Sequence, residues 1–319
     1  MTSARIEEFG RTRDLAALTA DLHAAGGPLV EPDSTDLLVT FVWIGPQRQV
    51  SVRGAQLFED RNAMSHPMHQ VPGTEVWHLS VRAPRGLTTV YQYLVEDPFI
   101  DADMNDLALL GRLVAESRER SYADPFNPRR LFPQSAKIAG VDDAPPGNWD
   151  SVLELPGLEP APWFDGEAPA LEEHHLVSDV LGNERTVAVY TPAGTGPYPL
   201  VVLLDGESWV SVARLHAALA RLMGDGTIAP AVVAFVANPA EGMTARMKEM
   251  ACDPDLTRML TEELLPLLRS AYDLSESVIV GGNSLGGLAA AFAALERPDV
   301  FGGVLSVSGS FWWGYLPTP

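Results

Sequence analysis

The stretch GGNSLGG holds the residue best suited to chemistry, because Ser284 lies between glycines with the spacing G-x-S-x-G. The apolar run SVIVGG precedes this serine, and the small-residue run LGGLAAAF follows it. A strand, a sharp turn and a helix in that order can present a serine hydroxyl as a nucleophile, since small neighbours keep the backbone clear of Oγ. We predict that Ser284 attacks an acyl carbon; the structural alternative is a tight turn that contains a serine by chance.

A serine nucleophile also needs donors for the negative charge that develops on the substrate oxygen. The Leu285 N–H would lie at the N-terminus of the following helix, where the helix dipole favours negative charge. The second donor of such a site comes from the loop after an earlier central strand, which here reads DGESW. We therefore predict an oxyanion hole made by the backbone of Leu285, Gly206 and Glu207.

The elements that must position these groups follow an alternating pattern in residues 170–319. The runs YPLVVLLDG, PAVVAFVANP and SVIVGG are continuously apolar, as is typical of strands buried on both faces of a parallel sheet. HHLVSDVL and ERTVAVYTP read as a leading strand pair, and FGGVLSVSGSF as a last strand. Helices are predicted between them. In one, 255–271, Pro266 should kink the helix or leave a carbonyl unpaired, and the inward residues are Leu256, Leu260, Leu264, Leu267 and Ala271. In another, 285–295, Leu288, Phe292 and Leu295 lie inward. The fold class is α/β.

The first half of the chain has a different period. A helix is predicted for residues 4–25, before a series of short strands rich in β-branched and aromatic residues, separated by Gly/Pro turns. Such a series is typical of a small antiparallel sandwich, which we assign to residues 1–145 together with a polar helical insertion near 103–118. The proline-rich residues 146–169 read as a linker to the α/β domain.

The stretches LLDGESW, RMKEM, EELLP, GGNSLGGLAA and SVSGSFWW occur in the order and approximate spacing of the enterochelin (ferric enterobactin) esterases. VTFVWIG, GTEVWHLS, TTVYQYLV and ADPFNPR resemble the amino-terminal domain of the same family, so the resemblance covers nearly the whole chain. It implies an α/β-hydrolase domain of the esterase D group, with an incomplete parallel sheet, preceded by an Ig-like antiparallel β-sandwich domain.

The resemblance also implies a function. Such enzymes hydrolyse the trilactone ester bonds of catecholate siderophores and so release iron, which enters only as part of the substrate, with no other cofactor. The resemblance implies that Ser284 is the acyl-forming nucleophile. It also implies that Arg246 and Glu249 are the family's Arg-x-x-Glu pair, in which Arg246 binds catecholate oxygens. Trp312 and Trp313 become a ring-stacking wall. The alternatives are a surface ion pair at i, i+3 for the first two residues and core packing for the tryptophans.

The partners of the serine are harder to place. In α/β-hydrolases the acid and the histidine follow the nucleophile in sequence. The seven histidines all precede Ser284, at His23, His66, His69, His78, His174, His175 and His216. Beyond the serine the only acidic residues are Glu296 and Asp299, at the end of the next helix. We expect a sheet truncated after its sixth strand, without the acid and base of the triad, and a nearly inactive polypeptide.

The composition of the chain limits the classes of molecule that it could bind. A formal net charge of −20 argues against nucleic acid and against an anionic membrane surface. The single cysteine, Cys252, the absence of a signal-peptide pattern and the shortness of the apolar runs favour a cytoplasmic protein. No metal is predicted, because neither His66-x-x-His69 nor His174-His175 has a third ligand at a suitable spacing. The expected partner is a small-molecule siderophore; the oligomeric state is left open.

Two other functions remain open at this point. A general carboxylesterase of the esterase D group would use the same chemistry, although simple esterases of that group lack the amino-terminal domain. A non-catalytic ferric-siderophore binding protein would retain the cleft without turnover.

Overall fold

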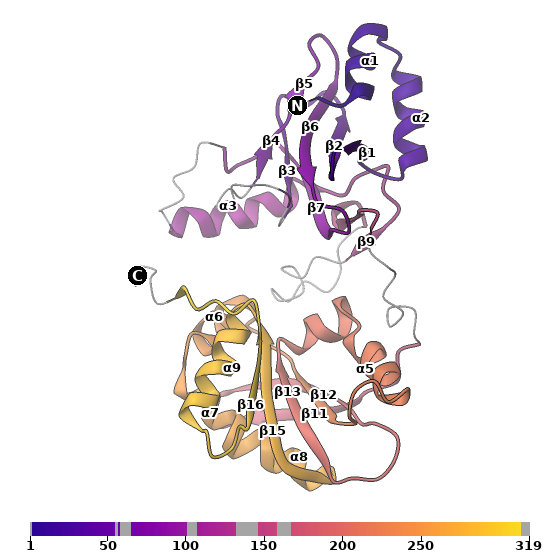
Figure 1. Cartoon of the computed structure of the whole chain (residues 1–319). Helices are drawn as coiled ribbons and strands as arrows, with labels where there is room; N and C mark the ends of the chain where they lie inside the picture. Colours follow the sequence, from indigo (N-terminus) through magenta and orange to yellow (C-terminus); the bar gives the residue numbers. More distant parts are fainter. Residues whose placement is uncertain are drawn as a thin grey trace. The chain divides into compact units, whose positions relative to one another are not determined.

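The computed structural model describes residues 2–54, 57, 65–100, 107–131, 146–157 and 167–313, and the chain divides into two compact units (Figure 1). The first unit holds Met1–Pro133 and Asp143–Pro160, and the second holds Gln134–Asp142 and Ala161–Pro319.

The first unit is built from two antiparallel sheets. Its strands are β1 (Leu29–Asp33), β2 (Asp36–Ile44), β3 (Val50–Arg53), β4 (His66–Pro67), β5 (His69–Gln70), β6 (Val76–Ala83), β7 (Thr88–Val95), β8 (Ser121–Tyr122), β9 (Arg130–Leu131) and β10 (Asp150–Glu154). One sheet has the order β1-β2-β6-β5, and the other has β4-β3-β7-β10-β9, with β8 paired to β7. Alternate residues of β2, among them Val39 and Phe41, join Val52 of β3 and Tyr93 of β7 in one hydrophobic core.

Two helices cover the other face of the first sheet. They are α1 (Ala4–Thr12) and α2 (Leu15–Ala25), whose Phe9 and Leu22 pack with Val42 and Val76. The single helix predicted for residues 4–25 is wrong: Arg13 adopts a left-handed conformation with φ 60° and ends α1. The side chain of Asp14 then accepts a hydrogen bond from the Ala17 N–H and begins α2, as an N-cap does. The polar helical insertion is present as α3 (Leu107–Glu119).

Part of the predicted linker is ordered secondary structure. A 3₁₀ turn at η1 (Pro146–Asn148) leads into β10, which pairs with β7 and β9. Ser151 and Leu153 are buried there, and this short alternation was hidden among the surrounding prolines. Residues 158–166 of the predicted linker lie outside the described residues.

The second unit is a mixed sheet between helical layers. Its strands are β11 (Glu172–Ser178), β12 (Asn183–Tyr190), β13 (Tyr198–Leu204), β14 (Val232–Val236), β15 (Leu274–Asn283) and β16 (Gly303–Val307), and its helices are η3 (Ser208–Val212), α5 (Leu215–Gly224), α6 (Met243–Met250), α7 (Pro254–Arg258), η4 (Met259–Leu264), α8 (Leu265–Ala271) and α9 (Leu285–Glu296). The strand order is β11-β12-β14-β13-β15-β16. The pairs β11–β12 and β12–β14 are antiparallel, and the other pairs are parallel. This arrangement is of the α/β-hydrolase type.

Alternation along the central strands divides the core of this unit into two layers. Val202 and Leu204 of β13 face a cluster formed with α6 to α9, whereas Leu203 faces a smaller cluster with α5 and Trp209. Continuous apolar strands are therefore explained by burial on both faces, as predicted.

Two predicted helix faces are wrong in detail. The helix around Pro266 contains the π-helical turn η4, which ends before Pro266 takes its place in the first turn of α8. The wider turn rotates the buried face, so that Leu265 and Leu268 are fully buried after it, whereas Leu267 is only partly buried and Ala271 is exposed. In α9 the small side chains Ala289, Ala290 and Ala293 are buried together with Leu285, whereas Leu288 is partly buried and Leu295 is 81% exposed.

Candidate active site

Ser284 stands exposed in the turn between β15 and α9. Its backbone has φ 56° and ψ −119°, a region that non-glycine residues rarely occupy and that costs about 1–3 kcal/mol. The turn is held by the Ser284 N–H, which donates to the Val307 carbonyl at 2.9 Å, and by the Ser310 N–H, which donates to the Ser284 carbonyl at 3.0 Å. Strain retained in this way at an exposed hydroxyl is typical of a functional residue.

The glycines around the serine are required by space. A Cβ on Gly282 would lie 2.5 Å from the backbone carbon of Gly286, and one on Gly287 would lie 2.7 Å from Ser306 Oγ. A side chain at Gly282 would push the turn and the first residues of α9 apart, and one at Gly287 would push α9 away from β16. The first glycine of G-x-S-x-G is therefore required for close packing of the turn on α9.

The predicted oxyanion residues follow the neighbouring parallel strand. β13 pairs with β15, so the turn Asp205–Glu207, here called the oxyanion turn, lies at the same sheet edge as Ser284. Gly206 packs against β14 so closely that a Cβ would lie 2.5 Å from the carbonyl carbon of Phe235. Leu285 is the first residue of α9, and an N–H there has no acceptor within the helix. These two amides remain the candidates for the oxyanion hole.

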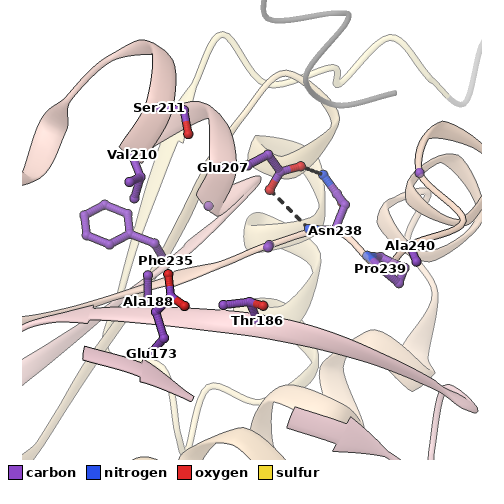
Figure 2. Close-up of a pocket in the computed structure, with 13 residues that line it drawn as sticks. Glu173, Thr186, Ala188, Glu207, Val210, Ser211, Phe235, Asn238, Pro239 and Ala240 are labelled. Carbon is purple, nitrogen blue, oxygen red and sulfur yellow. Dashed lines mark hydrogen bonds between the residues drawn. The ribbon is translucent and has the colours of Figure 1, made fainter. Parts of the chain in front are cut away.

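The side chain of Glu207, the third predicted residue, is held by Asn238. Burial raises the pKa of the Glu207 carboxyl, and hydrogen bonds from its own N–H and from Asn238 partly offset this effect. The Asn238 side chain donates to Glu207 Oε1 at 2.5 Å, and the Asn238 N–H donates to Oε2 at 3.1 Å, as Figure 2 shows. The Glu207 carboxylate is therefore held by the segment that follows β14.

The hydroxyl of Ser284 has an unexpected neighbour. Its Oγ lies 3.1 Å from Ser310 Oγ, a buried group in the loop that follows β16. In the described part of the second unit the histidines contact other groups: His174 lies 2.5 Å from the Tyr272 hydroxyl, and His175 lies 3.1 Å from Glu184. His216 is buried on α5, where burial and Arg214 lower its pKa. Sequence reasoning missed Ser310, although its place after a parallel strand pointed to the same edge.

Arg246 and Glu249 lie in two separate buried ion pairs of α6. Arg246 is 6% exposed and donates through Nε and Nη2 to the two carboxylate oxygens of Asp205, at 2.7 and 2.8 Å. Glu249 accepts from Arg185 Nη2 at 3.0 and 3.1 Å. The surface i, i+3 pair is therefore wrong, and the Arg246 guanidinium is already occupied by a carboxylate. Asp205, which sequence reasoning overlooked, directly follows β13.

The two tryptophans differ in environment. Trp312 is 57% exposed and follows Phe311, which is 59% exposed, whereas Trp313 packs partly against the main core of the unit. Their ring centroids are 6.0 Å apart. Ser310 contacts Ser284, and the exposed rings of Phe311 and Trp312 directly follow Ser310 in the chain.

A cavity of about 430 Å³ adjoins the oxyanion turn (Figure 2). Its lining combines Gly206, Glu207 and Asn238 with apolar side chains such as Val210 and Phe235. Ser284 is not among the lining residues. In the described residues no three or more His, Cys, Asp or Glu side chains are grouped to hold a metal ion, and no helix is long and apolar enough to cross a membrane.

Comparisons with known proteins agree in both units. The family described as "Enterochelin esterase, N-terminal" matches residues 38–164, and that described as "Putative esterase" matches residues 178–317. The iron(III) enterobactin esterase of Dickeya dadantii is 30% identical, over 91% of this chain and 70% of its own. The iron(III) salmochelin esterase of Escherichia coli O6:H1 is 28% identical, over 95% and 73%.

Solved structures give the same result. The ferric enterobactin esterase of Salmonella typhimurium matches with a TM-score of 0.73 and 29% identity, over 90% of this chain and 76% of its own. The enterobactin esterase of Shigella flexneri, determined in the presence of enterobactin, matches with a TM-score of 0.73 and 27% identity, over 97% and 79%.

Proposed function

Because this chain belongs to the enterochelin (iron(III) enterobactin) esterase family of carboxylic-ester hydrolases, we propose that it hydrolyses the ester bonds of ferric catecholate siderophores. In this proposal Ser284 loses its hydroxyl proton and attacks the lactone carbonyl carbon, and the N–H groups of Leu285 and Gly206 stabilise the resulting oxyanion. The ester oxygen takes up a proton and leaves as an alcohol, and water then hydrolyses the acyl-serine to the free acid and regenerates Ser284.

The observation that carries the proposal is the strained, exposed conformation of Ser284 at the N-terminus of α9, beside the oxyanion turn. A serine hydroxyl becomes a strong nucleophile only when a base accepts its proton. Ser310, its neighbour in the described residues, is not a base at neutral pH and does not fill this role. The exposed ring of Trp312 supports stacking on a catechol.

The test is the hydrolysis of ferric enterobactin, followed by chromatography of the catecholate products. We expect products from the wild type and from Ser270→Ala, a matched serine change on the exposed surface of α8, but none above background from Ser284→Ala. Equal product formation by Ser284→Ala would refute the role of this serine.

Two alternatives are separated by parallel measurements. Turnover of an activated aryl ester without binding of a ferric catecholate would indicate a general carboxylesterase. Binding of the ferric catecholate, seen in its visible absorbance, without hydrolysis would indicate a binding protein.

Finer features belong to the same proposal. We assign the first unit to an Ig-like β-sandwich, the compartment to the cytoplasm and the chemistry to a cofactor-free hydrolase that meets iron only in its substrate. The two packed antiparallel sheets, the single cysteine Cys252 and the serine turn support these assignments.

A further inference from the structure

Asp205 has a conformation that its neighbours must enforce. It lies between the last residue of β13 and Gly206, with φ 60° and a side chain that is 1% exposed. A left-handed backbone costs a non-glycine residue about 1–2 kcal/mol. A buried carboxylate is costly as well unless it is paired.

Three hydrogen bonds hold this carboxylate. Arg246 of α6 donates to both oxygens, at 2.7 and 2.8 Å, and the Asn238 side chain donates to Oδ1 at 2.8 Å. A guanidinium that binds both carboxylate oxygens fixes the orientation of the carboxylate as well as its charge. The start of the oxyanion turn is thereby tied to α6 and to the loop after β14.

The same carboxylate touches the helix that carries the nucleophile. A Cβ on Gly286 would lie 3.0 Å from Asp205 Oδ2, so the oxygen rests against the first turn of α9, two residues after Ser284. Asp205 therefore fills the space between the two segments whose amides would form the oxyanion hole. Alone, its negative charge would oppose an oxyanion nearby, and the Arg246 guanidinium neutralises it.

We propose that the Asp205–Arg246 ion pair positions the oxyanion hole, holding the Gly206 and Leu285 amides at the separation that a tetrahedral oxyanion requires. Arg246 is then a positioning residue, not a siderophore ligand. This inference rests on the proposed role of Ser284 as nucleophile, but not on the identity of the ester.

The second ion pair of α6 offers a matched control. Arg185 of β12 is also buried, with a side chain that is 1% exposed. It binds Glu249, which follows Arg246 by three residues on α6. Its Nη2 makes two contacts with that carboxylate, at 3.0 and 3.1 Å. This pair ties α6 to β12, and it includes no residue of the oxyanion turn.

The experiment compares Arg246→Lys with Arg185→Lys, since lysine keeps the charge but cannot bind a carboxylate with two parallel donors. The substrate is p-nitrophenyl acetate, which needs the nucleophile and the oxyanion hole but no siderophore site. For Arg246→Lys we expect a kcat about 10–100-fold lower with KM within about twofold, because a misplaced donor weakens only the transition state. Arg185→Lys should lower Tm comparably and keep kcat within about twofold of the wild type. Equal losses of kcat in both variants would overturn the inference.

Hydrogen–deuterium exchange gives a readout that needs no turnover. Amides of the oxyanion turn should exchange faster in Arg246→Lys than in the wild type, and at the wild-type rate in Arg185→Lys. If Arg246→Lys does not fold, Asp205→Asn, which keeps the side-chain size, should show the same loss of kcat and the same faster exchange. Unchanged exchange in the turn would overturn the inference even if ferric enterobactin proves not to be the substrate.

Discussion

Replacement of Gly282 by alanine tests the geometry of the serine turn directly. The added Cβ would lie 2.5, 2.6 and 3.0 Å from the carbonyl carbon, the oxygen and the Cα of Gly286. These are backbone atoms, which cannot swing aside as the end of a side chain can. Gly282 does not have a positive φ, so the penalty comes from space and not from backbone conformation.

The magnitude follows from these distances. Carbon atoms normally approach to about 3.5–4 Å, so the turn must open by about 1 Å. Overpacking of this kind costs about 1–3 kcal/mol. At roughly 2–4 °C per kcal/mol for a unit of this size, Tm should fall by about 2–12 °C. A displacement of about 1 Å at the nucleophile should also lower the rate of ester hydrolysis about 100-fold.

The assay is a thermal melt followed by circular dichroism, together with p-nitrophenyl acetate hydrolysis. Gly224→Ala is the control, because this exposed glycine at the end of α5 has nothing within 4 Å of an added Cβ. We expect it to keep or slightly raise Tm and to leave the rate unchanged. A Gly282→Ala protein that melts and reacts like the wild type would refute the packing argument for the motif.

Other predictions concern single side chains. Burial raises the pKa of the Asp150 carboxyl to about 6, an effect that Arg53 partly offsets. The free energy of unfolding that the protonated carboxyl contributes is therefore lost as pH rises from about 4 to 6. In urea unfolding, Asp150→Asn should remove that part of the pH dependence, and an unchanged pH profile in this variant would contradict the prediction. Trp312→Ala should weaken ferric catecholate binding about 3–10-fold at constant Tm, whereas Trp313→Ala should lower Tm. Equal effects of the two tryptophan changes on binding and Tm would contradict the difference in their environments.

The sequence was most informative where burial on both faces leaves a continuous apolar run. The strands β13, β14 and β15 and the turn at Ser284 could be located in this way, because strand period and glycine spacing are local properties. The family resemblance extended this to both halves of the chain.

What the sequence did not reveal depends on contacts distant along the chain. Arg246 has Glu249 three residues away, yet it pairs with Asp205, 41 residues away, because the end of β13 is the site where α6 docks. The π-helical turn η4 and the alanine face of α9 are likewise set by packing, which overrides the simple helical period. Ser310 meets Ser284 only because β16 pairs with β15.

The central claim is that Ser284 is the nucleophile, and covalent labelling tests it most directly. The folded protein is incubated with an activated aryl phosphonate at alkaline pH, digested with trypsin and mapped by fragment mass spectrometry. We predict one phosphonyl group, on Ser284, absent from the Ser284→Ala protein and present in Ser270→Ala. An unlabelled wild type, or the same label in Ser284→Ala, would contradict this claim.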